Sequence, residues 1–322
     1  MATAMQIGND GGEAASVEVE PADVAERTVR AHVAQLLEAA ERVQASADPD
    51  AVHQLRTSAR KLRASLKVYG AAFPKQLAAR ARKSVKHVAR ALDDARIWDG
   101  HRELLQRVYA ASNRQDEKAA VEYVLETVDD RRVDCRKEFL RDLEKVDLVK
   151  LGTLLDRLAS KAKHGKRNKR RAKDTRKVVM RLVEAALGGI DEARTVEAVE
   201  ELQRVRTPLR RLGHTLEVLE LEAVRPVADL EQALGDLILR TRTLKLVDEA
   251  RGKLADAGRT VLTEGMTRVA GRIGDEQREL RERLSGLRQR IDRDLLTKQL
   301  DDALASGEAT HDDADESEED ED

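Results

Sequence analysis

The stretch VHQLRTSARKLRASLKVY, residues 52–69, contains apolar side chains that recur every three or four residues. Because an α-helix completes a turn in about 3.6 residues, this spacing places them in one stripe along one side of a helix. The stripe consists of Val52, Leu55, Ala59, Leu62, Leu66 and Tyr69. Asp48-Pro49 is a helix-start signal before the segment, and Gly70 is a stop signal after it. We therefore predict a helix that packs one face into a helical core.

Basic side chains line the flank beside this stripe at the same spacing. They are His53, Arg56, Arg60, Arg63 and Lys67. Like charges at this spacing repel by roughly a few tenths of a kcal/mol per pair, yet residues 52–72 contain no acid. A bound anion would remove the repulsion, because arginine forks bind phosphate oxygens in pairs and a lysine acts as a point charge. We expect this flank to bind an anion, with a solvated face as the alternative.

Two further assignments concern single side chains. His53 could cap its helix or pack in the core, but its place in line with four cations favours contact with the ligand. A neighbouring phosphate would then favour its protonated form. Arg96 and Asp99 are expected to pair with each other rather than with a ligand.

A second segment repeats the basic helix later in the chain. Residues 202–212, LQRVRTPLRRL, align without a gap with residues 52–62, VHQLRTSARKL. Arg206, Arg210 and Arg211 stand at the positions of Arg56, Arg60 and Lys61. A gapless internal repeat predicts two related helical halves that face a shared site.

The predicted helix from Pro74 to about Asp94 carries another basic row. Arg82, Lys86 and Arg90 are four residues apart and share one face. The row is a candidate second wall of the binding site, and a solvated face would explain it equally well.

Composition favours an all-α fold. Aromatic residues make up 2% of the 322 residues, and there are only 5 prolines, whereas Ala, Leu, Arg, Glu and Lys dominate. No segment alternates in the manner of a strand. Besides the helices already described, helical periodicity covers residues 23–43, 101–111, 116–145, 148–159, 176–187, 194–220, 226–252 and 256–304.

Charge is segregated along the chain, although the net charge is only -2. Residues 312–322 contain nine of the 61 acids and residues 1–22 contain four, so 23–311 keeps 48 acids against all 59 bases. A basic body with an acidic tail favours a polyanionic partner. We expect a disordered lead over 1–22, a helical domain over 23–305, and a disordered acidic tail over 306–322. The domain would divide into halves over 23–160 and 174–305, joined by an exposed basic connector over 161–177.

Several functional classes are disfavoured by the sequence. Cys135 is the only cysteine, so no disulfide framework is expected. We find no signal peptide and no apolar run long enough to span a membrane, and we expect a cytoplasmic protein without membrane contact. No phosphate-binding loop, nucleophile elbow or zinc-protease motif occurs, and the histidines lack metal-ligand spacing. Catalytic residues, cofactors and metals are therefore not expected.

The basic motifs resemble the conserved histidine α-helical domain, or CHAD, family over residues 23–300. His53, Arg56, Arg60, Lys61, Leu62 and Arg63 are similar to its motif His-x-x-Arg-x-x-x-Arg-(Lys/Arg)-Leu-Arg. Leu92-Asp93-Asp94-Ala95-Arg96-Ile97-Trp98-Asp99 resembles the element that follows it, Leu-(Gly)-x-x-Arg-x-x-Asp, and Leu234-Gly235-Asp236 is its counterpart in the second half. The resemblance implies two antiparallel helical bundles related by a pseudo-twofold axis, with long basic helices lining a shared groove or pore. It also implies binding of inorganic polyphosphate, association with polyphosphate granules and no catalysis.

The second half departs from this pattern. Gln203 stands where the family carries its histidine, Gly213 and His214 replace an expected Arg-Tyr pair, and Pro208 interrupts the basic helix. In the first half, Asp93 replaces the glycine of the trailing element. We expect the first half to dominate binding.

A nucleic-acid binder is the main alternative, since counterion release would drive binding of either polyanion. Single-strand binders stack bases on aromatic side chains, and none of the six aromatic residues belongs to the basic row. Binding of duplex DNA through segment 161–177 remains an alternative. A scaffold that pairs the predicted long helix 256–304 with a partner helix is a third hypothesis, and a homo-oligomer is left open.

Overall fold

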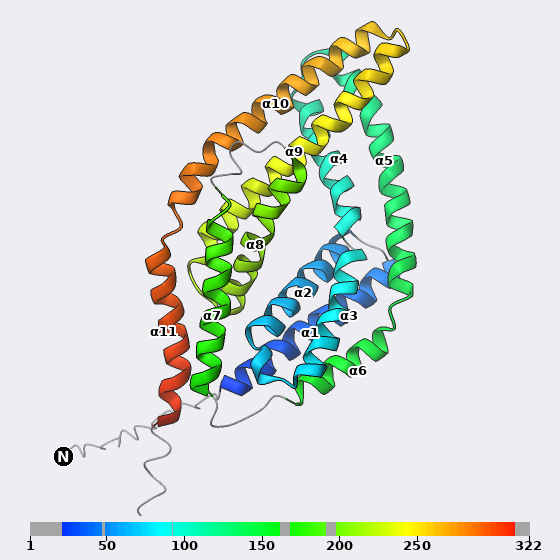
Figure 1. The fold of residues 1–322 in the computed structure, drawn as a ribbon. Coiled ribbons are helices and arrows are strands. Elements are labelled where there is room, and N and C mark those ends of the chain that lie inside the picture. Colours follow the sequence, from blue (N-terminus) through cyan, green and yellow to red (C-terminus); the bar gives the residue numbers. More distant parts are fainter. Residues whose placement is uncertain (1–20, 47–48, 92, 162–167, 191–197, 313–322) are drawn as a thin grey trace, which may run out of the picture.

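The computed structural model describes residues 21–46, 49–91, 93–161, 168–190 and 198–312 (Figure 1). This part of the chain contains eleven α-helices and one short 3-10 helix, and no strand occurs in these ranges. The all-α prediction is therefore confirmed. The helices bury three main apolar cores, and the arrangement of these cores positions the candidate site.

The first core belongs to the N-terminal half. It is formed by α1 (Pro21–Ser46), α2 (Pro49–Val68), α3 (Lys75–Ala91), α6 (Leu148–Ala159) and the C-terminal end of α5 (Gln115–Glu144), with the 3-10 helix η1 (Gly70–Ala72) between α2 and α3. Leu55, Leu62 and Leu66 of α2 are fully buried here, as the apolar stripe predicts. Each buried leucine contributes about 1.5–3 kcal/mol, so the stripe fixes how α2 is rotated about its axis.

The second core repeats this arrangement in the C-terminal half. It combines α7 (Asn168–Leu187), α8 (Val199–Val218), α11 (Arg293–Asp312), the N-terminal part of α9 (Val224–Asp256) and the C-terminal part of α10 (Thr260–Gln289). Helix α8 spans 199–218 and α2 spans 49–68, so both ends differ by 150 residues. The buried Val205, Leu209 and Leu212 stand at the positions of the buried Leu55, Ala59 and Leu62. The internal repeat therefore extends to helix bounds and burial, while the pseudo-twofold axis stays a prediction.

The third core joins the two halves. It is formed by α4 (Asp93–Ala111) and the N-terminal part of α5 from the first half, packed on the C-terminal part of α9 and the N-terminal part of α10. In Figure 1 the long helices α5, α9 and α10 converge at the end of the molecule opposite α6 and α11. Gly265 permits this approach, because a Cβ there would overlap the carbonyl of Asp116. The buried Glu117 carboxylate accepts from Ser112 Oγ at 2.6 Å and pairs with Arg272 at 3.1 Å.

A smaller contact joins the two basic helices directly. Ala64 and Val68 of α2 pack with Val218 of α8. Beside them the Lys61 ammonium lies 2.6 Å from the Glu217 carboxylate. The two repeated helices therefore contact each other near their C-terminal ends.

Several helix boundaries differ from the sequence-based prediction. The segment 256–304 is two helices, because Ile291 is buried between them and the Asp292 carboxylate accepts from the backbone N–H groups of Asp294 and Leu295, which caps α11. Helix α7 already begins at Asn168, inside the predicted connector 161–177, and α11 continues to Asp312, past residue 306. Helix α8 contains Pro208, in agreement with the predicted helix 194–220. Residues 1–20 and 313–322, which make up most of the predicted lead and tail, lie outside the described residues, as do residues 162–167 of the predicted connector.

Candidate anion-binding cavity

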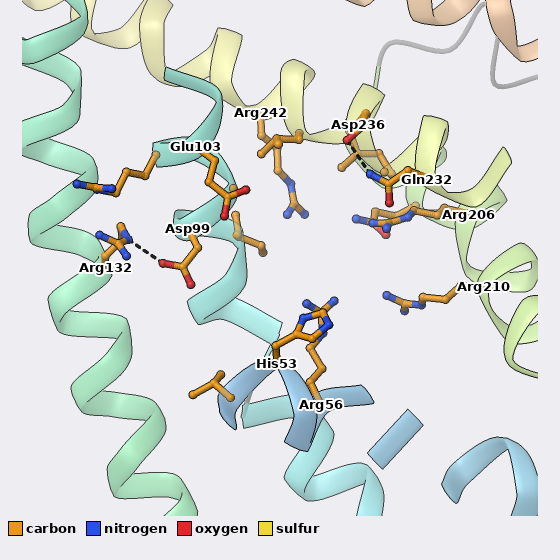
Figure 2. A pocket seen from close by; sticks show the side chains of 18 of the residues that line it. His53, Arg56, Asp99, Glu103, Arg132, Arg206, Arg210, Gln232, Asp236 and Arg242 are labelled. Carbon is orange, nitrogen blue, oxygen red and sulfur yellow. Dashed lines mark hydrogen bonds and ion pairs between the residues drawn. The ribbon is translucent and has the colours of Figure 1, made fainter. Parts of the chain in front are cut away.

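A cavity of about 750 Å³ lies where α2, α4, α5, α8 and α9 meet. Figure 2 shows side chains from these helices pointing into it from several sides, with His53 and Arg56 opposite Arg242 and Asp236. The lining residues that carry polar groups are Asp50, His53, Arg56, Asp99, Arg102, Glu103, Arg107, Arg132, Gln203, Arg206, Arg210, Gln232, Asp236 and Arg242. Seven are arginines and four are carboxylates, so the lining is basic overall.

Helix α2 contributes the start of its basic flank. His53 is exposed, whereas Arg56, one turn later, is only 8% exposed although it lines the cavity. The fully buried Leu55 between them sets the rotation of the helix and so directs this flank toward the cavity. Burial of a guanidinium costs free energy unless the group is paired or hydrogen-bonded. Arg56 is therefore the side chain of this flank whose placement at the cavity depends most on its surroundings.

Helix α8 contributes Gln203 and Arg206, the equivalents of His53 and Arg56, and in addition Arg210. Arg206 reaches across to α9, where its Nη2 lies 2.7 Å from Oε1 of Glu231. Its guanidinium also lies directly against Gly235 of α9. In Figure 2, Arg206 and Arg210 enter the cavity from the same side.

Helices α4 and α5 form a wall whose charges compensate one another. Arg132 of α5 donates from Nε to Asp99 at 2.7 Å and from Nη1 to Asp129 at 3.0 Å, and Arg102 of α4 donates to the same Asp129 oxygen at 3.0 Å. Burial opposes the charge on Arg132, but these two carboxylates hold its pKa above its ordinary value. This network makes the α4–α5 wall locally neutral.

Helix α9 lines the side of the cavity that faces α2. Gln232 donates to the carboxylate of Asp236 at 3.2 Å, and Arg242 points into the cavity (Figure 2). Arg242 and Arg107 have no carboxylate partner among the described residues, unlike Arg102, Arg132 and Arg206. The uncompensated positive charge of the cavity therefore includes these two side chains.

The contact between α4 and α9 beside the cavity contains a buried histidine. Nδ1 of His101 lies 2.8 Å from Oγ1 of Thr243, whose hydroxyl donates to the Leu239 carbonyl at 2.9 Å. Because the threonine proton is used there, the histidine Nδ1 donates to the threonine oxygen. Burial, and to a smaller extent the charge of Arg242, lower the pKa of His101 to about 4.

The structure brings four of the predicted binding residues together at the cavity: His53, Arg56, Arg206 and Arg210. The other predicted residues of the two basic helices, Arg60, Arg63, Lys67 and Arg211, do not line it. Burial, and next the charge of Arg211, lower the pKa of Lys67, so these two cations approach each other where α2 and α8 meet.

The predicted second wall on α3 does not line the cavity. Arg82 and Lys86 are exposed on the outer face of α3, and Arg82 Nε donates to the Ala78 carbonyl of the same helix at 3.3 Å. The side chain of Arg90 lies outside the described residues. A binding role for this row stays a prediction.

Four further arginines line the cavity from α4, α5 and α9 and were not predicted from the sequence: Arg102, Arg107, Arg132 and Arg242. They do not form a row of basic residues at helical spacing in the sequence. They come close to α2 because their helices pack together in the third core. Asp99 makes an internal ion pair, as expected, and its described partner is Arg132. The Arg96 side chain lies outside the described residues, so its pairing stays a prediction.

Within the described ranges, no three His, Cys, Asp or Glu side chains are arranged to hold a metal ion. No described helix is long and apolar enough to cross a membrane.

The chain is similar to a known family in sequence and to known structures in fold. A family model described as CHAD domain matches residues 27–238, more than half of the chain. No curated protein matches the sequence. Among solved structures, PptA from Streptomyces chartreusis is similar with a TM-score of 0.57 and 16% identity, over 83% of this chain and 99% of that one. The CHAD domain from the plant Ricinus communis is similar with a TM-score of 0.53 and 17% identity, over 84% of this chain and 92% of that one. At such identities the likeness concerns the fold.

Proposed function

The chain belongs to the CHAD domain family, and on this premise we propose that it binds inorganic polyphosphate in the cavity between α2, α4, α5, α8 and α9, without catalysing a reaction. The observation that carries the proposal is the convergence of seven arginines from five helices on one cavity of about 750 Å³. Arginine forks match the paired oxygens of phosphate groups, and hydrogen bonds to charged groups are about twice as strong as neutral ones.

The composition of the lining favours a ligand without bases. No Phe, Tyr or Trp is among the lining residues. Single-stranded nucleic acids are usually held by stacking on such rings, which contributes about 1–3 kcal/mol per base. A chain of phosphates needs only cations and hydrogen-bond donors, and the cavity supplies both.

The cavity can hold only a short segment of a long polymer, because sites of about 300–1,000 Å³ ordinarily enclose small molecules. The remaining basic residues of the repeated helices would then contact the polymer where it leaves the cavity. These residues are Arg60, Arg63, Lys67 and Arg211. On this proposal the protein acts in the cytoplasm, in association with polyphosphate granules.

The proposal is tested by removing the two uncompensated cavity arginines. Arg107→Gln combined with Arg242→Gln takes away two positive charges without breaking any of the carboxylate pairs described above. We expect affinity for long-chain polyphosphate at physiological salt to fall roughly a hundredfold, about 1.4 kcal/mol for each lost contact. Isothermal titration calorimetry measures the change.

The matched control removes two arginines away from the cavity. Arg251 and Arg278 are each paired with an acid three residues earlier, Asp248 and Asp275. Their replacement by glutamine lowers the net charge equally and should change affinity less than about threefold, since only long-range attraction is lost. An equal loss in both double variants would show non-specific attraction and contradict the cavity assignment.

Competition decides between polyphosphate and nucleic acid. Duplex DNA and single-stranded RNA are titrated against bound, labelled polyphosphate at the same salt and the same phosphate concentration. Polyphosphate binding that survives an excess of both supports the proposal. Displacement by duplex DNA at equal phosphate concentration would favour the nucleic-acid alternative.

A further inference from the structure

Arg206 is the cavity arginine whose position depends most visibly on one neighbouring residue. An ideal Cβ placed on Gly235 would lie 2.6 Å from Nη2, 2.8 Å from Cζ and 3.2 Å from Nε of Arg206. Side-chain carbons do not approach other heavy atoms within 3.0 Å, so the guanidinium occupies the space that any other residue at position 235 would fill. The Arg206 guanidinium therefore lies close against α9 at Gly235.

The same guanidinium is fixed from a second direction. Glu231, one turn before Gly235 on α9, forms an ion pair in which its Oε1 lies 2.7 Å from Arg206 Nη2, and the two side chains are only 20% and 19% exposed. Nε of Arg206 is buried without a hydrogen-bond partner. A side chain that gives up one hydrogen bond must be held by its other contacts, which here are the Glu231 carboxylate and the surface of Gly235.

No requirement of the backbone explains the glycine. Position 235 lies inside the continuous helix α9, and Gly258 is the one described glycine with positive φ. Inside a helix, glycine is less stable than alanine, because it loses more conformational freedom on folding. Gly252 of the same helix shows the difference, since a Cβ there would meet nothing within 4 Å.

We infer that Gly235 and Glu231 form a seat for Arg206 and act as positioning residues for anion binding. Gly235 leaves room for the guanidinium, and Glu231 orients it, so that Arg206 enters the cavity beside Arg210 (Figure 2). The inference rests on the proposed function for its ligand, but the seat itself is a property of the folded chain and is tested without ligand.

The experiment is a double-mutant cycle with Gly235→Ala, Arg206→Ala and the combined variant. If the alanine acts through Arg206, Gly235→Ala lowers the melting temperature and weakens polyphosphate binding about tenfold, as the loss of one charged contact does. In the Arg206→Ala background the clash is gone. Gly235→Ala then leaves affinity unchanged and raises the melting temperature, because alanine favours the helix. Gly252→Ala is the matched control and should raise the melting temperature in both backgrounds without affecting affinity.

An equal loss of melting temperature on Gly235→Ala with and without Arg206 would overturn the seat. So would a Gly235→Ala protein that binds polyphosphate as tightly as wild type. If wild type itself fails to bind polyphosphate, the proposed function is wrong, and the melting temperatures of the cycle still decide whether Gly235 seats Arg206.

Discussion

Helices α2 and α8 are two copies of one scaffold that hold their charges differently. They have the same length and bury their apolar stripes at equivalent positions, such as Leu55 and Val205, and each directs arginines to the cavity. Residues 52–72 of the first copy contain no acid, whereas the second copy has its Arg206 paired with Glu231. The contrast shows that the repeated apolar stripe preserves the scaffold, while the side chains on its flank have diverged.

The same contrast recurs where the two helices meet. Continuing the gapless alignment, Glu217 of α8 stands at the position of Lys67 of α2. Glu217 lies 2.6 Å from Lys61, and hydrogen bonds from His214 first, and then from Lys61, lower its pKa to about 2. The pKa of Lys67 is instead lowered, first by burial and then by the charge of Arg211. Near this contact Glu217 therefore interacts with opposite charge, whereas Lys67 interacts with like charge.

The largest expected loss of affinity comes from removing the arginines of the basic flank of α2. Replacing Arg56, Arg60 and Arg63 with alanine should weaken polyphosphate binding roughly a thousandfold, if each contact contributes about 1.5 kcal/mol. The equivalent set on α8, Arg206, Arg210 and Arg211, should cost less, about a hundredfold, because Arg206 is already paired with Glu231. Calorimetry on both variants measures the difference, and circular dichroism checks that helix content is kept. Equal losses would contradict the predicted dominance of the first half.

Acidification should loosen the contact that joins the two halves beside the cavity. The folded-state pKa of His101, about 4, lies below the ordinary value of 6.5. Between these values the unfolded chain binds a proton that the folded chain excludes, so stability is complete above about pH 6.5 and falls as pH drops toward 4. The expected loss is about 2–3 kcal/mol. Urea unfolding from pH 7 to pH 4 measures it, and His101→Gln should make the profile flatter; an unchanged slope would mean that another group titrates.

A smaller gain is expected when Glu217 is neutralised. Glu217→Gln removes the carboxylate that pairs with Lys61 and His214, so both side chains become available to the ligand. The C-terminal part of α8 then lacks this acid, as α2 does. We expect about threefold tighter polyphosphate binding at low salt and a steeper dependence of affinity on salt. Glu200→Gln, at an exposed position in the first turn of α8, is the control for the change in net charge. If both variants gain equally, the effect is general electrostatics.

The smallest effect concerns the acidic C-terminal residues. Residues 312–322 contain nine acids and no base, and we expect them to compete with polyphosphate for the basic cavity. Removal of residues 313–322 should tighten binding about twofold at low salt and have no effect at high salt, where such attraction is screened. An identical affinity at low salt would count against this competition.

The sequence was sufficient for the fold and for about half of the site. Apolar periodicity predicted the helices, and the gapless repeat predicted that α2 and α8 would present Arg56 and Arg206 to one cavity. The periodicity could not reveal Arg132 or Arg242, because these arginines reach the cavity through packing of α5 and α9 in the third core. Nor could it show that Arg82 and Lys86 lie on the outer face of α3, since helical spacing defines a face but not its neighbour.

A structure of the protein with bound polyphosphate would locate the ligand directly. We expect phosphate groups inside the cavity, within hydrogen-bond distance of both Arg56 and Arg206 and so between the two repeated helices. Phosphates along Arg82 and Lys86 on the outer face of α3, with the cavity free of them, would contradict binding in the cavity.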